Sequence, residues 1–184
     1  ANLWRQFDFR MTSYQLGTMT TVAPNVLVCP SSRSGHCYAG CHHDSPAPID
    51  VDNHGVLFLN SSLRLQDVTD GLASTLIVGE ILWGSALGAW YQGTEATLRN
   101  SRAPFDGAGP AKAGGIYQGL TAQSNGTQPA AGGAPLPQQF GSPHADGVHF
   151  AFCDGAVRYV SREIDDELLR RLGNRQDGEV VNGF

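Results

Sequence analysis

The first residues that could do chemistry are His42, His43 and Asp44, which follow Cys41 in a long predicted loop over residues 31–50. Imidazole, thiolate and carboxylate groups all bind transition metals, so this run suggests a metal site. Side chains of adjacent residues diverge in an extended chain, however, and neighbouring histidines seldom bind one ion. We therefore interpret these histidines as solvent-facing or hydrogen-bonded groups.

A second candidate is the acidic run that contains Asp50, Asp52 and Asn53. Its spacing, with a glycine six residues in, is typical of the opening of a calcium loop. The pattern is incomplete, because His54 stands at position five and Ser61 stands where a bidentate Glu belongs. A calcium site centred on these residues would need ligands from elsewhere. The alternative is a polar turn that leads into a strand.

A nucleophile would have to come from Ser142 or Cys153, with His144 or His149 as its base. Ser142 lies in Gly-Ser-Pro, which lacks the strand-turn-helix context of a nucleophile elbow. Cys153 precedes a tight turn, and His149 lies two positions away on the same strand face. No glycine-rich phosphate loop follows a strand. We therefore predict that the chain is not an enzyme and has no catalytic residues.

The four cysteines are Cys29, Cys37, Cys41 and Cys153. Cys37 and Cys41 have no second Cys-x2-4-Cys pair to complete a zinc site. An even count in a loop-rich chain favours two disulfides and an oxidising compartment, with metal binding and free thiols as the alternatives. The three possible connectivities cannot be distinguished by counting.

The 184 residues predict a single domain over 1–184, with a formal net charge of −5 and no basic run. Nucleic acid is an unlikely partner, because phosphate binding requires clustered Lys and Arg. No stretch approaches the roughly 20 apolar residues of a membrane span. No secretory signal is present, and Ala1 in place of an initiator Met suggests a mature or trimmed chain.

Several elements are expected to carry these residues. The spacing of Leu3, Trp4 and Phe7 predicts the last turns of a helix. Residues 102–139 are rich in Gly, Ala, Pro and Gln and are predicted to form an excursion within the domain. A short helix over 164–173 is predicted to be capped by Asp165, to bury Ile164, Leu168 and Leu172, and to stop at a left-handed Gly173, before a polar tail. Strands are predicted at 25–29, 56–60, 63–65, 72–80 (with a central run at 76–78) and 81–92.

The clearest local signal is a hairpin over 144–160 with Asp154-Gly155 as its turn. A two-residue loop pairs Phe152 with Val157 and Phe150 with Tyr159. Cross-strand partners share a face, so these four side chains are predicted to form one apolar patch. The other face would then carry His149, Ala151 and Arg158.

With this hairpin the chain resembles the planctomycete-type prepilin-like family of unknown function, whose C-terminal signature is a His, nine residues, then Asp-Gly. His144 followed by Asp154-Gly155 fits this spacing. Further matching blocks are spread from about residue 3 to residue 179: Cys29-Pro30-Ser31, Tyr38-Ala39-Gly40, Ala47 to Val56, Asp70-Gly71, Val78-Gly79-Glu80 and Ala96 to Asn100.

The resemblance implies an α+β fold: a pseudopilin-like antiparallel β-sheet with an N-terminal helix remnant, long loops and a short C-terminal helix. It also implies export to the periplasm or cell surface, as in type II secretion or type IV pilus-like systems. The long N-terminal helix of full-length members would precede Ala1. The family is sometimes labelled solute-binding, but no ligand or enzymatic activity comes with the resemblance.

The resemblance also bears on the cysteines, because the family commonly has Cys at positions 29 and 41. Two remaining unusual cysteines suggest a pair, so we predict Cys29–Cys41 and Cys37–Cys153 disulfides. His144 is predicted to have a structural role, in which both ring nitrogens hydrogen-bond and pin a loop. Asp154 is predicted to serve only the backbone conformation of the turn.

The leading hypothesis is a structural or interaction protein, the head of an exported pseudopilin-like subunit that partners with itself or with envelope proteins. Its membrane contact would come only through the absent N-terminal helix. The alternative is an extracytoplasmic module that binds calcium or a small solute near Asp50 and Asp52. No cofactor is otherwise expected.

Overall fold

The computed structural model describes residues 24–31, 37–82, 93–94, 96–102, 106–107, 139–179 and 181. The predicted N-terminal helix, residues 83–92 of the strand expected at 81–92, and nearly all of the 102–139 excursion lie outside these residues. Within the described part of the chain, no helix has the length and apolar character needed to cross a membrane.

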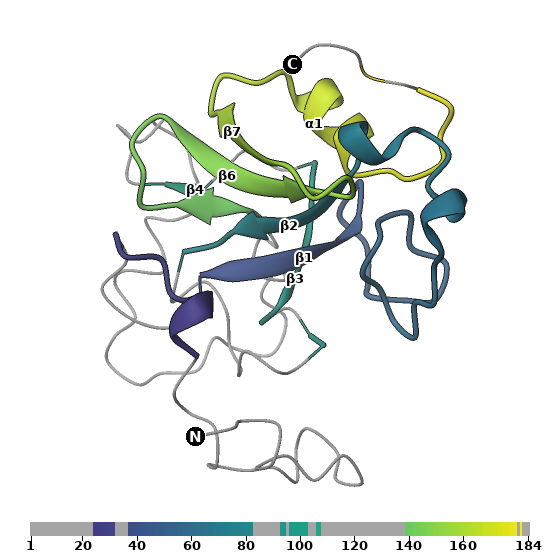
Figure 1. The fold of residues 1–184 in the computed structure, drawn as a ribbon, viewed down its shortest axis with the longest axis horizontal. Coiled ribbons are helices and arrows are strands. Elements are labelled where there is room, and N and C mark those ends of the chain that lie inside the picture. Colours follow the sequence, from purple (N-terminus) through teal and green to yellow (C-terminus); the bar gives the residue numbers. More distant parts are fainter. Residues whose placement is uncertain are drawn as a thin grey trace, which may run out of the picture.

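The fold is built on one five-stranded sheet in the order β3-β1-β2-β6-β7 (Figure 1). Neighbouring strands are antiparallel except β1 and β3, which are parallel, so the sheet is mixed rather than purely antiparallel as predicted. Together with a single short helix among the described residues, it confirms the α+β class. The strands are β1 Tyr38–His43, β2 Leu76–Glu80, β3 Leu98–Asn100, β6 Gly147–Phe152 and β7 Val157–Ser161; β4 Asp106–Gly107 and β5 Gly141–Ser142 form a separate parallel pair.

Strand β2 lies at the centre of the sheet, as its apolar run predicted. Its register places Gly79 opposite Phe150 on β6. An added Cβ at Gly79 would lie 2.4 Å from the Phe150 ring and 2.6 Å from the Phe140 ring. The glycine therefore leaves room for these two rings, which pack edge to face with centroids 5.0 Å apart.

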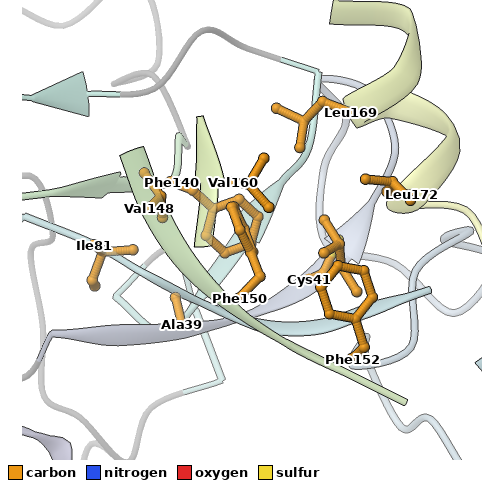
Figure 2. Packing of buried hydrophobic residues seen from close by; sticks show 11 residues of the cluster. Ala39, Cys41, Ile81, Phe140, Val148, Phe150, Phe152, Val160, Leu169 and Leu172 are labelled. Carbon is orange, nitrogen blue, oxygen red and sulfur yellow. The ribbon is translucent and has the colours of Figure 1, made fainter. Parts of the chain in front are cut away.

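One face of the sheet carries the core (Figure 2). Side chains from β6, Phe140 and the helix α1 Asp166–Leu172 meet there with almost no exposure. The buried cluster consists of Ala39, Cys41, Leu76, Ile81, Phe140, Val148, Phe150, Phe152, Val160, Leu169 and Leu172. This packing leaves the opposite face of the sheet for the polar residues described below.

The hairpin is present, but its predicted register is wrong by one residue. Phe150 pairs with Arg158 and Ala151 pairs with Val157. The loop has three residues rather than two, because Phe152 bonds with Ala156 and Gly155 takes a φ of +84°. A one-residue shift moves every side chain of one strand to the other face. Val157 and Tyr159 therefore lie opposite the core, and the predicted four-residue apolar patch does not form.

Three predicted strands are absent. Residues 25–29 begin with a 3-10 turn, η3 Asn25–Leu27, in which Leu27 N–H donates to the Pro24 carbonyl. Residues 56–60 form turns, because the N–H groups of Val56 and Leu57 both donate to the carbonyl of Cys41 rather than to a regular ladder. Residues 63–65 lead into a second 3-10 turn, η4 Leu65–Asp67, and the Leu65 side chain is exposed. A third such turn, η5 Leu72–Ser74, precedes β2.

Helix α1 is capped as predicted, since the Asp165 carboxylate accepts from the N–H groups of Glu167 and Leu168. Its buried stripe is Leu169 and Leu172, not the predicted Leu168. Gly173 is not left-handed, with φ −84°, and its lack of a side chain instead admits the hydroxyl of Ser101.

The segment after α1 is not the polar tail that we predicted. Asn174 and Arg175 are buried. The Arg175 guanidinium donates to the carbonyls of Asn53 and Gly55 at 2.6 and 2.9 Å. The segment therefore holds the acidic loop against the C-terminal helix, which periodicity could not indicate because these contacts are polar and distant in sequence.

Candidate functional site

Glu80, the last residue of β2, is the centre of a polar cluster on the sheet face opposite the core. Its side chain is only 3% exposed. One carboxylate oxygen, Oε2, accepts from the Ser142 hydroxyl at 2.8 Å and from the backbone N–H of His149 at 2.8 Å. The same oxygen lies 3.2 Å from His149 Nδ1. The carboxylate is therefore held by groups from β5 and β6.

The other carboxylate oxygen of Glu80 faces His144 and Cys29. His144 Nε2 lies 3.5 Å from Glu80 Oε1 and 3.7 Å from the Cys29 Sγ. These two residues reach the cluster from loops, one after η3 and one between β5 and β6. Ligand atoms of Cys29, Glu80 and His144 all lie within 4.8 Å of one another.

The loop that carries His144 is held by Arg162, which follows β7. The Arg162 guanidinium donates to the carbonyls of Ser142 and His144, both at 2.9 Å, and to that of Ala145 at 3.0 Å. The His144 backbone N–H also donates to the Ser142 hydroxyl. These hydrogen bonds position the imidazole through backbone atoms of its loop and do not involve the ring itself. The His144 ring itself faces a carboxylate and a thiol through Nε2. Its predicted role, in which both ring nitrogens pin a loop, stays a prediction.

A pocket of about 460 Å³ lies over this cluster. Glu80 and His144 contribute its polar wall, and side chains of β1, β2, β6 and β7 contribute its apolar floor. Its lining is Cys29, Pro30, Ser31, Tyr38, Val78, Glu80, His144, His149, Phe150, Ala151 and Val157. Burial raises the pKa of the Tyr38 hydroxyl, and the acidic groups Cys29 and Glu80 raise it further. The pocket therefore has thiol, carboxylate and phenol groups in its lining.

The geometry is not that of a nucleophile with a general base. A triad uses the two ring nitrogens of the histidine for different partners, whereas here Cys29 and Glu80 both face Nε2 of His144. Ser142 contacts the carboxylate, not an imidazole. Cys153 lies at the hairpin turn, where burial raises the pKa of its thiol to about 11. The structure therefore brings Ser142, His144 and His149 together, but Cys153 is not part of the cluster.

Two of the residues predicted to bind calcium, Asp50 and Asn53, instead hydrogen-bond within their own loop. Asn53 Oδ1 accepts from the Asp50 N–H at 2.9 Å and lies 2.9 Å from His42 Nδ1. Asp50 Oδ1 accepts from the N–H of Val51. Asp52 is exposed. The described clusters of His, Cys, Asp and Glu with metal-ligand spacing include neither Asp50 nor Asp52.

A second cluster contains His43, Asp44 and His54. Its carboxylate already has cationic and amide partners, because Asp44 Oδ2 accepts from Arg170 Nη1 and Asn174 Nδ2, both at 2.9 Å. A bound cation would be repelled by the guanidinium. We interpret this cluster as the polar joint between the end of β1 and the C-terminal segment, in agreement with the hydrogen-bonded role predicted for the histidine run.

No disulfide joins any of the four cysteines in this structure, so neither predicted disulfide is present. Cys41 Sγ lies in the core near the carbonyls of His43 and Gly173, at 3.6 and 3.8 Å. Burial raises the pKa of this thiol to about 12. Cys29 faces His144 instead of Cys41. The pairing was inferred from which cysteines look unusual, and such an argument contains no geometry.

A family model described as a protein of unknown function (DUF1559), with the label SBP_bac_10, matches residues 1–167 of the chain. The chain belongs to the DUF1559 family. No curated protein and no solved structure matches it significantly. The match confirms the part of the resemblance that pointed to a family of unknown function, and the role of this DUF1559 chain has to be argued from the site.

Sequence reasoning did not identify the Glu80 cluster as a site. Three blocks on which the resemblance rests contain its members: Cys29-Pro30-Ser31, Val78-Gly79-Glu80 and the signature His144. Within these blocks, Cys29, Glu80 and His144 are each more than 50 residues from the next along the chain. In this DUF1559 chain Glu80 ends β2, whereas Cys29 and His144 reach it from loops, and these long-range contacts could not be read from the sequence.

Proposed function

We propose that this chain is the head domain of an exported, pseudopilin-like subunit that acts by assembly with copies of itself at the cell envelope. The observation that supports this proposal best is a pair of exposed apolar side chains on β7, at the edge of the sheet face opposite the core. Val157 and Tyr159 on β7 are 68% and 49% exposed there. Large exposed apolar side chains that gather on one face are typical of an interaction surface.

This face is well suited to a contact with another chain. Tyr38, Val78 and Ala151 continue it across β1, β2 and β6 and are only partly buried. The core and α1 cover the other side of the sheet. A pseudopilin-like subunit uses a sheet of this kind as the outer part of a polymer. Export to the periplasm or cell surface is part of the same proposal.

The test is site-specific photocrosslinking of the full-length gene product in its own cells. A crosslinking amino acid at Tyr159 is expected to give a ladder of homo-oligomers in the envelope fraction. Leu65 serves as the matched control, because it is 69% exposed but lies on η4, away from this face. A protein that fractionates with the cytoplasm, or that crosslinks to itself equally from both positions, would refute the proposal.

The pocket over Glu80 favours a second candidate, a module that binds a small solute. Its volume of about 460 Å³ is within the range of small-molecule sites, and its apolar floor and few polar groups fit that class. Calcium is not the ligand that this geometry favours, because the loop at Asp50 uses its own oxygens internally. Ligand-dependent increases in the melting temperature of the purified chain would distinguish this candidate from assembly.

A further inference from the structure

We infer that Cys29, Glu80 and His144 form a mononuclear site for a divalent transition metal, Zn²⁺ by preference, with a fourth coordination position open to the pocket. This inference goes beyond the proposed function and does not depend on it. It rests on the positions of three side chains, on the hydrogen bonds that orient them, and on the charge of the buried carboxylate.

The distances fit a tetrahedral ion. With metal–ligand bonds of about 2.3 Å to sulfur and about 2.1 Å to nitrogen or oxygen, ligand atoms of a tetrahedral site lie about 3.4–3.6 Å apart. His144 Nε2 lies 3.5 Å from Glu80 Oε1 and 3.7 Å from Cys29 Sγ. The first distance is at the outer limit of a hydrogen bond. Both are close to the edges of such a tetrahedron.

The three ligand atoms also converge on one point. A hydrogen-bonded relay runs through the two nitrogens of an imidazole, but here one nitrogen, Nε2 of His144, faces both the thiol and the carboxylate. Only one of these neighbours can share the single proton of that nitrogen. A cation between the three atoms would satisfy all of them at once.

Glu80 is oriented for such a role by its second oxygen. Oε2 accepts hydrogen bonds from the Ser142 hydroxyl and the His149 backbone N–H, and it lies 3.2 Å from His149 Nδ1. Oε1 is left facing His144 and Cys29. Hydrogen bonds of this kind fix the geometry of metal-bound carboxylates and are as characteristic of a metal site as the ligands.

The charge balance points the same way. Glu80 is 3% exposed, and no Lys or Arg of the described chain pairs with it. Burial of an ionised carboxylate is costly without a compensating positive charge. A divalent ion would supply that charge, and thiolate, imidazole and carboxylate together are a set that Zn²⁺ accepts. Three protein ligands and an open fourth position are typical of sites in which the metal binds an exogenous molecule.

The experiment titrates the purified, chelator-stripped chain with Co²⁺ as a spectroscopic substitute for Zn²⁺. One equivalent is expected to bind with a thiolate-to-cobalt charge-transfer band and the intense visible bands of a four-coordinate ion. Cys29→Ser should abolish the thiolate band, and Glu80→Gln should weaken Zn²⁺ binding by at least about tenfold, as losses around metal ligands commonly do. Circular dichroism checks that each variant is folded.

The matched controls are Cys153→Ser, which removes a thiol that is not part of the pocket lining or of the cluster, and His54→Ala, which removes a ligand candidate from the second cluster. Both should retain the thiolate band and the stoichiometry. If Cys29→Ser fails to fold, His144→Ala decides, because that side chain is 31% exposed and lies on a loop. Failure of the wild-type chain to take up one equivalent, or a thiolate band that survives in Cys29→Ser, overturns the inference.

Discussion

The clearest quantitative prediction concerns Asp44, which joins the end of β1 to the C-terminal segment. Its side chain is 6% exposed. It accepts from Arg170 and Asn174 and lies 3.0 Å from His54 Nδ1. Burial alone would raise the pKa of this carboxyl, but the hydrogen bonds from Asn174 and His54 outweigh burial and lower it from 3.8 to about 2. We predict that Asp44→Asn removes a pH-dependent part of the stability.

The magnitude follows from linkage. A carboxyl whose pKa is lower in the folded state stabilises that state above the unfolded pKa, and this contribution is lost as the pH falls through the folded pKa. One pKa unit corresponds to about 1.4 kcal/mol, so the ionised form of Asp44 contributes about 2 kcal/mol near neutral pH. Most of this should disappear between about pH 5 and pH 2.

The assay is urea denaturation of the wild-type chain and Asp44→Asn at a series of pH values from 7 to 2. The difference between their free energies of unfolding is expected to shrink by about 2 kcal/mol as the pH falls, because a protonated Asp44 resembles the neutral amide. Asp52→Asn is the matched control, since Asp52 is exposed on the same loop and should give a difference near zero. If the difference in unfolding free energy between the wild-type chain and Asp44→Asn stays constant from pH 7 to pH 2, the reasoning is refuted.

Two further substitutions test the packing and the helix cap. Gly79→Ala is expected to lower the free energy of unfolding by about 1–3 kcal/mol, because its methyl group would overlap the ring of Phe150. Gly93→Ala is the control and should be close to neutral, because no atom lies near the added methyl group. Thermal melts of both variants check this, and equal stabilities would contradict it. Asp165→Ala should lower the free energy of unfolding by about 1 kcal/mol, because two N–H groups at the start of α1 lose their acceptor. Urea denaturation measures this, and an unchanged midpoint would show that the cap is not needed.

The parts of the fold that sequence predicts are those fixed by local chemistry. The cap at Asp165 and the central run at 76–78 were identified correctly, since each depends on neighbours in the chain. The strand expected at 56–60 fails because its N–H groups bond to Cys41, fifteen or more residues away. An apolar run does not specify the hydrogen-bond partners of its backbone, and no residue of 56–60 is fully buried.

The candidate site was predictable only in part. His144 was singled out by its spacing from Asp154-Gly155, but the contacts of its ring with Cys29 and Glu80 were not anticipated. Glu80 was quoted as part of a block, but nothing in its neighbours marks it as a buried carboxylate. The contact of Cys29 with His144 spans 115 residues, so no spacing rule could find it. The predicted Cys29–Cys41 disulfide would compete with this contact. The structure has the contact and not the disulfide.

The turn of the β6–β7 hairpin decides which residues accompany the site. A two-residue loop would have placed Arg158 beside His149 on the face of the pocket. The extra residue, made possible by the positive φ of Gly155, sends Arg158 to the core face, where its guanidinium lies 4.6 Å from the centre of the Phe152 ring. Tyr159 takes the place beside His149 instead, with ring centroids 4.8 Å apart.

This exchange matters for the electrostatics of the pocket. An Arg next to Glu80 would neutralise the buried carboxylate and compete with any bound cation. With Tyr159 and Val157 there, the partners of the carboxylate among the described residues are histidine, hydroxyl and backbone groups. One glycine in a tight turn thus keeps a permanent positive charge away from the Cys29–Glu80–His144 cluster. The same turn places two apolar side chains on the face that we propose for assembly, so the surface and the pocket share one structural cause.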